Sequence, residues 1–240
     1  MIDANCYYGH WPNQSPCLVC EEDLKPLRSL GIERFCLCAT TSLFRNAQAG
    51  NEEVIEFAER TPGVIPVAVI GDDPQAADDV EQLIDKGVRL FRGPSRPVVR
   101  RSTFATSAER LSEAECGLIL PYGYDPFTPY DLAWHRWVRS MAKDHPRMRV
   151  ILVGLNYPHM AGILDLVESY ANTYLEISHF QVCDGIRLLC DSVGAGRLVF
   201  GTDCPRFAPE CAVLKLDRAD IDTASRQAIA VENLNAILEG

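Results

Sequence analysis

Side chains that can transfer protons stand at the ends of several short runs of β-forming residues. Asp203 follows the apolar run 198–201, and His179 and Arg92 hold comparable positions at the ends of two other runs. A carboxylate and an imidazole can exchange protons with a substrate, and a guanidinium can bind an anionic group on it. The pattern therefore predicts Asp203, His179 and Arg92 as catalytic residues.

Polar residues near the ends of other runs are candidates for binding the substrate, because ligand sites combine apolar walls with a few placed polar groups. Side chains alternate along a strand, and outward positions must be apolar to receive helices. With Leu175 and Ile177 facing outward, Glu176 points into the interior. The same alternation turns Asp3 inward. The predicted substrate-binding residues are Asn5, Tyr7, His10, Tyr122, Asn156, His159 and Glu176.

A carboxylate inside a folded interior is costly unless a cation pairs with it. The nearest partners for Glu176 are Arg89 and Arg92, whichever of the two faces inward. We therefore expect an internal ion pair. Such a pair more often stabilises the fold than takes part in catalysis. A structural role for Glu176 therefore ranks ahead of a direct catalytic one.

Eight runs rich in β-forming residues recur along the chain, and stretches with helical periodicity separate most of them. Gly31, Gly63, Gly87 and Gly194 stand where helices would end just before strands. The predicted strands are 2–7, 34–39, 64–69, 88–92, 117–122, 150–154, 173–178 and 198–201. The predicted helices are 22–30, 51–60, 74–86, 130–144, 160–170, 182–193, 209–216 and 223–238.

This alternation of strands and helices predicts a parallel sheet connected by right-handed crossovers. Eight such units with a closing helix fit 240 residues, so we predict a (β/α)8 TIM barrel of the α/β class, a single domain over residues 1–240. A doubly wound open sheet is the structural alternative. Ligands of such barrels bind at the carboxyl ends of the strands, where the candidate residues stand.

The composition narrows the expected partners and compartment. The chain is 47% hydrophobic and 23% charged, and its formal charge of −10 disfavours binding to nucleic acid or anionic membranes. No apolar leader or membrane-spanning run stands out, so we expect a cytoplasmic protein. The expected partner is a small-molecule ligand, and a homodimer stays open. The ten cysteines are expected to be mostly reduced thiols.

Two cysteine patterns leave chemical alternatives open. Cys17 and Cys20 have the Cys-x-x-Cys spacing, but no second pair follows at the spacing of a zinc site. Cys204 is next to Asp203 in the chain and could be a nucleophile activated by His179. The ordinary interpretation of both patterns is a set of thiols without a chemical role.

Histidines and arginines in the expected loops leave two more alternatives. His10, His159 and His179 could bind a metal ion together with Asp203, although loop histidines seldom do so. A basic run after the fourth predicted strand could receive an anionic substrate, although a solvated loop is its default interpretation. That run contains Arg96, Arg100 and Arg101.

Several segments, taken in order, carry a family resemblance over nearly the whole chain. The sharpest is Arg197-Leu-Val-Phe-Gly-Thr-Asp-Cys-Pro, and it is supported by Met1-Ile-Asp-Ala, Gly31-Ile-Glu-Arg, Asn51-Glu-Glu-Val, Gly87-Val-Arg-Leu and Asn233-Leu-Asn-Ala-Ile-Leu. Together they resemble the amidohydrolase-related family, a branch of the amidohydrolase superfamily that also contains decarboxylases and hydratases of aromatic acids.

The resemblance also implies a metal site, which this sequence lacks in its usual form. Active members hold a divalent metal, usually zinc, through a His-x-His pair on the first strand, histidines on the fifth and sixth strands and an aspartate on the eighth. Of these ligands only Asp203 is retained. The other positions hold Asn5, Tyr7, Pro121 or Tyr122, and Gly154. We therefore expect a subgroup without the usual metal, with zinc or another divalent ion as a minor alternative.

Two functions follow from these expectations. The first is a hydrolase or lyase of the amidohydrolase type that acts on a small molecule, such as a carboxylated one. In that version Asp203 is a general base or metal ligand, and Arg92 orients the anion. The second is a barrel that has lost catalysis and binds a small molecule or a protein.

Overall fold

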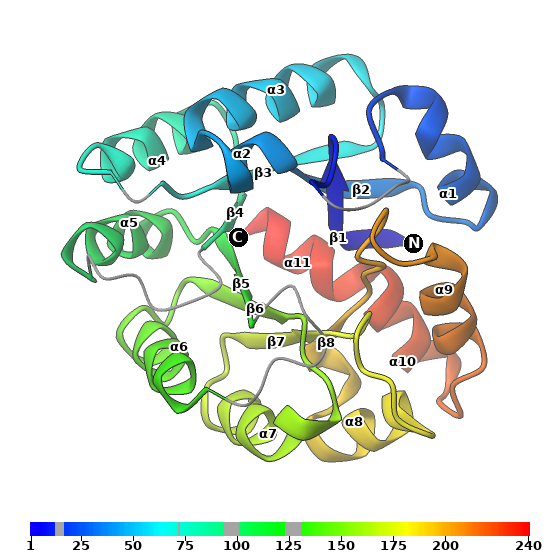
Figure 1. Ribbon diagram of the computed structural model, residues 1–240. Helices are drawn as coiled ribbons and strands as arrows, with labels where there is room; N and C mark the ends of the chain where they lie inside the picture. Colours follow the sequence, from blue (N-terminus) through cyan, green and yellow to red (C-terminus); the bar gives the residue numbers. More distant parts are fainter. Residues whose placement is uncertain (13–16, 72, 94–100, 123–130) are drawn as a thin grey trace.

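The computed structural model describes residues 1–12, 17–71, 73–93, 101–122 and 131–240. Its eight strands form one sheet in chain order, and each strand pairs in parallel with the next (Figure 1). Every strand predicted from the sequence is present. The strands are β1 (Ile2–Tyr8), β2 (Arg34–Ala39), β3 (Val64–Val69), β4 (Leu90–Arg92), β5 (Gly117–Pro121), β6 (Arg149–Val153), β7 (Thr173–Glu176) and β8 (Leu198–Val199).

The sheet closes on itself between β1 and the segment that follows β8. The backbone N–H of Ala4 donates to the carbonyl of Phe200 at 3.0 Å, and the N–H of Asp203 donates to the carbonyl of Asn5 at 2.8 Å. The predicted (β/α)8 TIM barrel is therefore confirmed. Since all strands are parallel, their carboxyl ends meet at one rim of the barrel.

Helices surround the barrel (Figure 1). None of those in the described ranges is long and apolar enough to cross a membrane. They are α1 (Lys25–Ser29), α2 (Thr40–Phe44), α3 (Ala47–Arg60), α4 (Ala76–Asp85), α5 (Arg101–Glu113), α6 (Leu132–Asp144), α7 (Met160–Ser169), α8 (Gly185–Val193), α9 (Pro209–Asp217), α10 (Thr223–Gln227) and α11 (Asn233–Glu239). Short 3-10 turns occur at Glu21–Leu24, Tyr157–His159 and Ala195–Arg197.

The helical assignments differ from the sequence-based prediction most clearly in three places, apart from shifts of a few residues at helix ends. Helix α2 is only five residues long, too short for periodicity to detect. Helix α5 is rich in Ser and Thr, which obscures its apolar stripe. The predicted final helix 223–238 consists of α10 and α11, joined by a π-helical segment over Ala228–Glu232.

Apolar side chains fill the barrel and separate its wall from the outer helices. One buried cluster lies inside the strands and another between the strands and the helices. Helix α11 contributes Leu234 and Ile237 to the inner cluster, together with Ile2 at the start of β1. Figure 1 shows α11 lying across the barrel. The side chain of Asn235 on α11 accepts a hydrogen bond from Arg34 at the start of β2, at 2.6 Å. Helix α11 therefore covers the end of the barrel where the strands begin, and the opposite rim is left for a site.

Strand β1 departs from simple alternation, which corrects the predicted direction of Asp3. The pairing register between β1 and β2 shifts between Asp3 and Cys6. Ile2 and Ala4 belong to the inner cluster, so Asp3 does not share the inward face with Asn5 and Tyr7. Its carboxylate instead accepts from Thr202 Oγ1 at 2.5 Å.

Candidate active site

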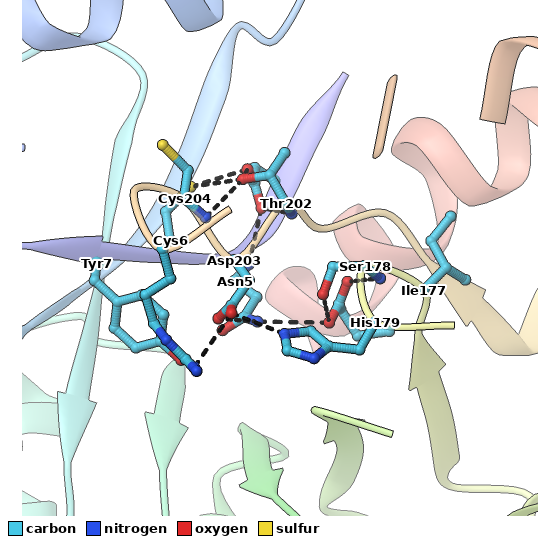
Figure 2. Close-up of polar contacts among 12 residues, drawn as sticks. Asn5, Cys6, Tyr7, Ile177, Ser178, His179, Thr202, Asp203 and Cys204 are labelled. Carbon is cyan, nitrogen blue, oxygen red and sulfur yellow. Dashed lines mark hydrogen bonds and ion pairs between the residues drawn. The ribbon is translucent and has the colours of Figure 1, made fainter. Parts of the chain in front are cut away.

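Asp203 lies just beyond β8 at the carboxyl-terminal rim, and three side chains contact its carboxylate. Figure 2 shows two of them, Asn5 and His179, beside it. Oδ2 is 2.8 Å from Nε2 of His179 and 3.2 Å from Nη1 of Arg206. Oδ1 accepts from Nδ2 of Asn5 at 3.2 Å. Only 1% of Asp203 is exposed. An imidazole, a guanidinium and an amide therefore hold this buried carboxylate in one position.

The backbone turn after β8 explains how Arg206 reaches Asp203. Asp203 has a φ of 59°, in the left-handed region that Asp adopts more readily than most residues. Its carbonyl accepts from the backbone N–H of Arg206 at 3.0 Å. This tight turn brings a side chain three residues along the chain back onto the carboxylate.

Arg92 on β4 links the site to β1. Its Nη1 donates to Oδ1 of Asn5 at 3.1 Å, and its Nη2 donates to the hydroxyl of Tyr7 at 2.6 Å. Arg92 is 1% exposed, whereas Arg89 on the same segment is exposed. Arg92 is therefore the arginine that faces the barrel interior, and it fixes the amide of Asn5 in the orientation that donates to Asp203.

Glu176 at the end of β7 is fully buried beside this network. Its Oε2 accepts from Ser178 Oγ at 2.8 Å and lies 3.5 Å from Nδ2 of Asn5. Burial raises the pKa of Glu176 to about 7, although the nearby His179 and the hydrogen bonds from Ser178 oppose the rise. Glu176 can therefore take up or release a proton near neutral pH.

The internal ion pair that we expected has different partners. Asn5 lies between Glu176 and Arg92, because its amide nitrogen faces Glu176 and its oxygen accepts from Arg92. The expected direct pair of Glu176 with a strand-four arginine is thus replaced by an amide bridge. The ion pair forms at Asp203, and its guanidinium comes from Arg206 beyond β8.

A lysine from α9 holds the turn that carries His179. The Nζ of Lys215 donates to the carbonyl oxygens of Ile177 at 2.6 Å and Ser178 at 2.8 Å. Burial lowers the pKa of Lys215. These bonds fix the backbone on both sides of the position from which the His179 ring reaches Asp203.

Aromatic side chains lie around the guanidinium of Arg206, and the Arg206 side chain is 6% exposed. Its Cζ lies 4.9 Å from the ring centre of Trp11, and the ring of Phe207 lies 4.8 Å from that of His179. Sequence reasoning did not include Arg206 among the candidates near the strand ends. Its three-residue spacing from Asp203 is the signal that could have identified it.

Three of the predicted substrate-binding residues form a second cluster, next to β5 and β6. His159 is 1% exposed, and its ring centre lies 4.2 Å from that of Tyr122. Nδ1 of His159 accepts from the backbone N–H of Asn156 at 3.1 Å. The side chain of Asn156 accepts from the backbone N–H of Gln181 at 3.3 Å, which ties this cluster to the loop after β7. Their roles in binding remain predictions.

His10 does not take part in the hydrogen bonds around Asp203. It is exposed and lies beside a surface hollow lined by Tyr8, Thr40 and Phe44. Across the described ranges, no three His, Cys, Asp or Glu side chains gather as a metal-binding group. The set of three histidines that we considered for a metal ion is thus not assembled.

The remaining alternatives from the sequence also find no support in these contacts. The thiol of Cys204 contacts Cys6, while Nε2 of His179 faces Asp203, so the suggested thiol–imidazole pair does not form. All ten cysteines, Cys17 and Cys20 included, are free thiols. The basic run lies outside the described part of the chain: Arg96 and Arg100 entirely, and Arg101 in its side chain.

The fold and the polar group at its rim define a (β/α)8 barrel of the kind that carries an active site at the carboxyl ends of its strands. The model of the amidohydrolase family matches residues 43–238, so the chain belongs to that family. A search of curated protein sequences gave no match.

Solved structures of similar fold include a 2,6-dihydroxybenzoate decarboxylase from Rhizobium, with 14% identity, a TM-score of 0.72 and coverage of 100% of this chain and 99% of that one. A dihydroxybenzoic acid decarboxylase from Polaromonas with bound manganese has 15% identity and a TM-score of 0.69, covering 93% and 86%. A probable 2-pyrone-4,6-dicarboxylic acid hydrolase from Acinetobacter baumannii has 12% identity and a TM-score of 0.71, covering 100% and 99%. At these identities the similarity shows the fold alone.

The family implies a divalent metal at Asp203, but the side chains around this aspartate do not fit one. Metal ligands are groups such as carboxylates, neutral imidazoles and thiolates, whose lone pairs converge on one point. Here Asn5 turns its N–H toward Asp203, the Tyr7 hydroxyl accepts from Arg92, and a guanidinium lies at Oδ2. Donors and like charges thus stand where a metal needs acceptors.

Proposed function

We propose that this protein is a hydrolase or lyase that cleaves a bond in a small carboxylated molecule at the carboxyl end of the barrel. The observation that carries this proposal is the buried pair of Asp203 and His179, 2.8 Å apart at the rim where such barrels hold their active sites. A carboxylate that orients an imidazole makes it an effective proton acceptor and donor. The pair therefore suits acid–base catalysis.

Each neighbouring side chain has a defined part in this proposal. His179 moves a proton to or from the substrate, and Asp203 orients its ring and stabilises the charged form. Glu176, with its pKa of about 7, can hold the proton between the two halves of the reaction. Asn5 places Glu176 and Asp203 next to each other, because its Nδ2 lies 3.5 Å from the first and 3.2 Å from the second.

Charge and shape at the site favour a carboxylated, flat substrate. The guanidinium groups of Arg92 and Arg206 bring positive charge to the rim, which attracts a carboxylate. Trp11 and Phe207 are partly exposed beside Arg206 and His179 and offer aromatic surface for a ring. The solved structures of similar fold named above include a 2,6-dihydroxybenzoate decarboxylase and a probable 2-pyrone-4,6-dicarboxylic acid hydrolase, which supports this substrate class.

Two probe compounds test the proposal and separate its two versions. The purified chain is incubated with 2,6-dihydroxybenzoate and with 2-pyrone-4,6-dicarboxylate, and products are followed by chromatography. Release of carbon dioxide from the first marks a lyase, and addition of water to the second marks a hydrolase. Asp203→Asn should lower kcat/KM by about 100-fold or more, whereas the exposed Asp217→Asn should leave it unchanged.

The same experiment can overturn the proposal. Saturable binding of either compound without turnover would assign the barrel to a binding module, which is the second function that the sequence left open. Turnover that Asp203→Asn leaves unchanged would remove this aspartate from the mechanism.

A further inference from the structure

Several contacts hold the side chain of Arg206 in the site beside Asp203. Its Nη1 lies 3.2 Å from Oδ2 of Asp203, and its side chain is 6% exposed. The guanidinium lies between aromatic rings, with its Cζ 4.9 Å from the centre of Trp11 and 5.8 Å from that of Phe207. Its backbone N–H closes the turn on the carbonyl of Asp203 at 3.0 Å. A salt bridge with this much support is a fixed part of the rim and not a mobile surface contact.

The guanidinium approaches the oxygen that a metal ion would use. Oδ2 is shared by Nη1 of Arg206 and Nε2 of His179, while Oδ1 accepts from Asn5. Both oxygens of Asp203 thus already face positive charge or N–H donors. A divalent cation at this place would displace the His179 contact and lie against a guanidinium, and like charges so close in a buried site repel strongly.

We propose that the guanidinium of Arg206 replaces the family's divalent metal ion at Asp203 and that this chain works without a metal there. Arg206 is a positioning residue in this account: it holds the Asp203 carboxylate in the orientation that contacts His179. This inference concerns the same site as the proposed function and adds to it. Of its three tests, only the turnover measurement rests on the proposed function.

Metal titration tests the first half of the inference without any need for turnover. The chelator-treated wild type and Asp203→Asn are titrated with Mn²⁺ in a calorimeter, because Mn²⁺ favours carboxylates over the exposed thiols of this chain. The two proteins should give the same heats. One Mn²⁺ per chain bound by the wild type with a Kd below about 10 μM and lost in Asp203→Asn would overturn the inference.

Thermal unfolding tests the second half. Arg206→Met should lower the Tm by roughly 5–10 °C, because a buried carboxylate loses its cation, and Arg206→Lys should restore most of that loss. In the Asp203→Asn background the effect of Arg206→Met should largely disappear. An equal loss of Tm in both backgrounds would show that Arg206 is not the counter-ion of Asp203. If Arg206→Met does not fold, Arg206→Lys in the two backgrounds and the Mn²⁺ titration decide.

Turnover gives a third readout that separates this inference from the proposed function. If the wild type converts either probe compound, removal of metals by chelator should leave kcat unchanged. Activity that disappears with chelator and returns with Mn²⁺ would overturn the metal-free account and leave the proposed function intact. Absence of turnover would count against the proposed function, while the first two measurements would still decide the role of Arg206.

Discussion

The buried carboxyl of Glu176 should make the stability of this protein fall as pH rises. Burial raises its pKa from 4.5 to about 7, so the folded protein holds this proton more tightly than the unfolded chain. Between those two pH values the unfolded chain has released the proton and the folded protein has not. A tenfold difference in proton affinity equals about 1.4 kcal/mol, so the group should remove about 3 kcal/mol from the free energy of unfolding across that window.

Urea unfolding of the wild type and Glu176→Gln at pH 5, 6, 7 and 8 measures this effect. Glutamine fills the same space without titrating, so the variant should lack the decline. From pH 5 to pH 8 the wild type should therefore lose about 2–3 kcal/mol more of its free energy of unfolding than the variant. Glu59→Gln, an exposed position on α3, is the matched control and should follow the wild type. Parallel curves for wild type and Glu176→Gln would refute the assignment of a near-neutral pKa to this carboxyl.

Two further substitutions test how the site is supported. Gly201→Ala would place a Cβ 2.5 Å from Oε1 of Glu176, so it should lower the free energy of chemical unfolding by about 1–3 kcal/mol. The control Gly196→Ala should be tolerated, because its Cβ would meet nothing within 4 Å. Equal effects of the two would contradict the packing around Glu176. Lys215→Met should cost a similar amount, about 1–3 kcal/mol, and lower turnover by loosening the turn of His179, since buried carbonyls lose their donor. A variant as stable and active as the wild type would show that this lysine does not position the turn.

Much of the fold could be predicted because the strands are recognisable in the sequence. Runs rich in β-forming residues marked all eight strands, four of them preceded by a glycine, and alternation with helices indicated their parallel order. Short or polar helices escaped, as α2 and α5 show. The inward direction predicted for Asp3 was wrong because periodicity does not reveal the register shift within β1.

The candidate site was predicted in its positions and less well in its contacts. Strand ends supplied Asn5, Glu176 and Asp203, which the barrel does bring together with His179. The guanidinium partner of Asp203 could not be found in the same way, because Arg206 reaches it through a turn and not along a strand. Hydrogen-bond partners depend on tertiary geometry, which strand periodicity does not encode.

The most direct test of the central claim is the turnover number of His179→Gln. The assay uses whichever probe compound the wild type converts, with His145→Gln, at the end of α6, as the matched control. If the imidazole of His179, which contacts Asp203, moves the proton, kcat should fall by about 100-fold or more in His179→Gln. The Tm of this variant should stay close to that of the wild type, and the control should be fully active. A folded His179→Gln protein with the kcat of the wild type would contradict the account.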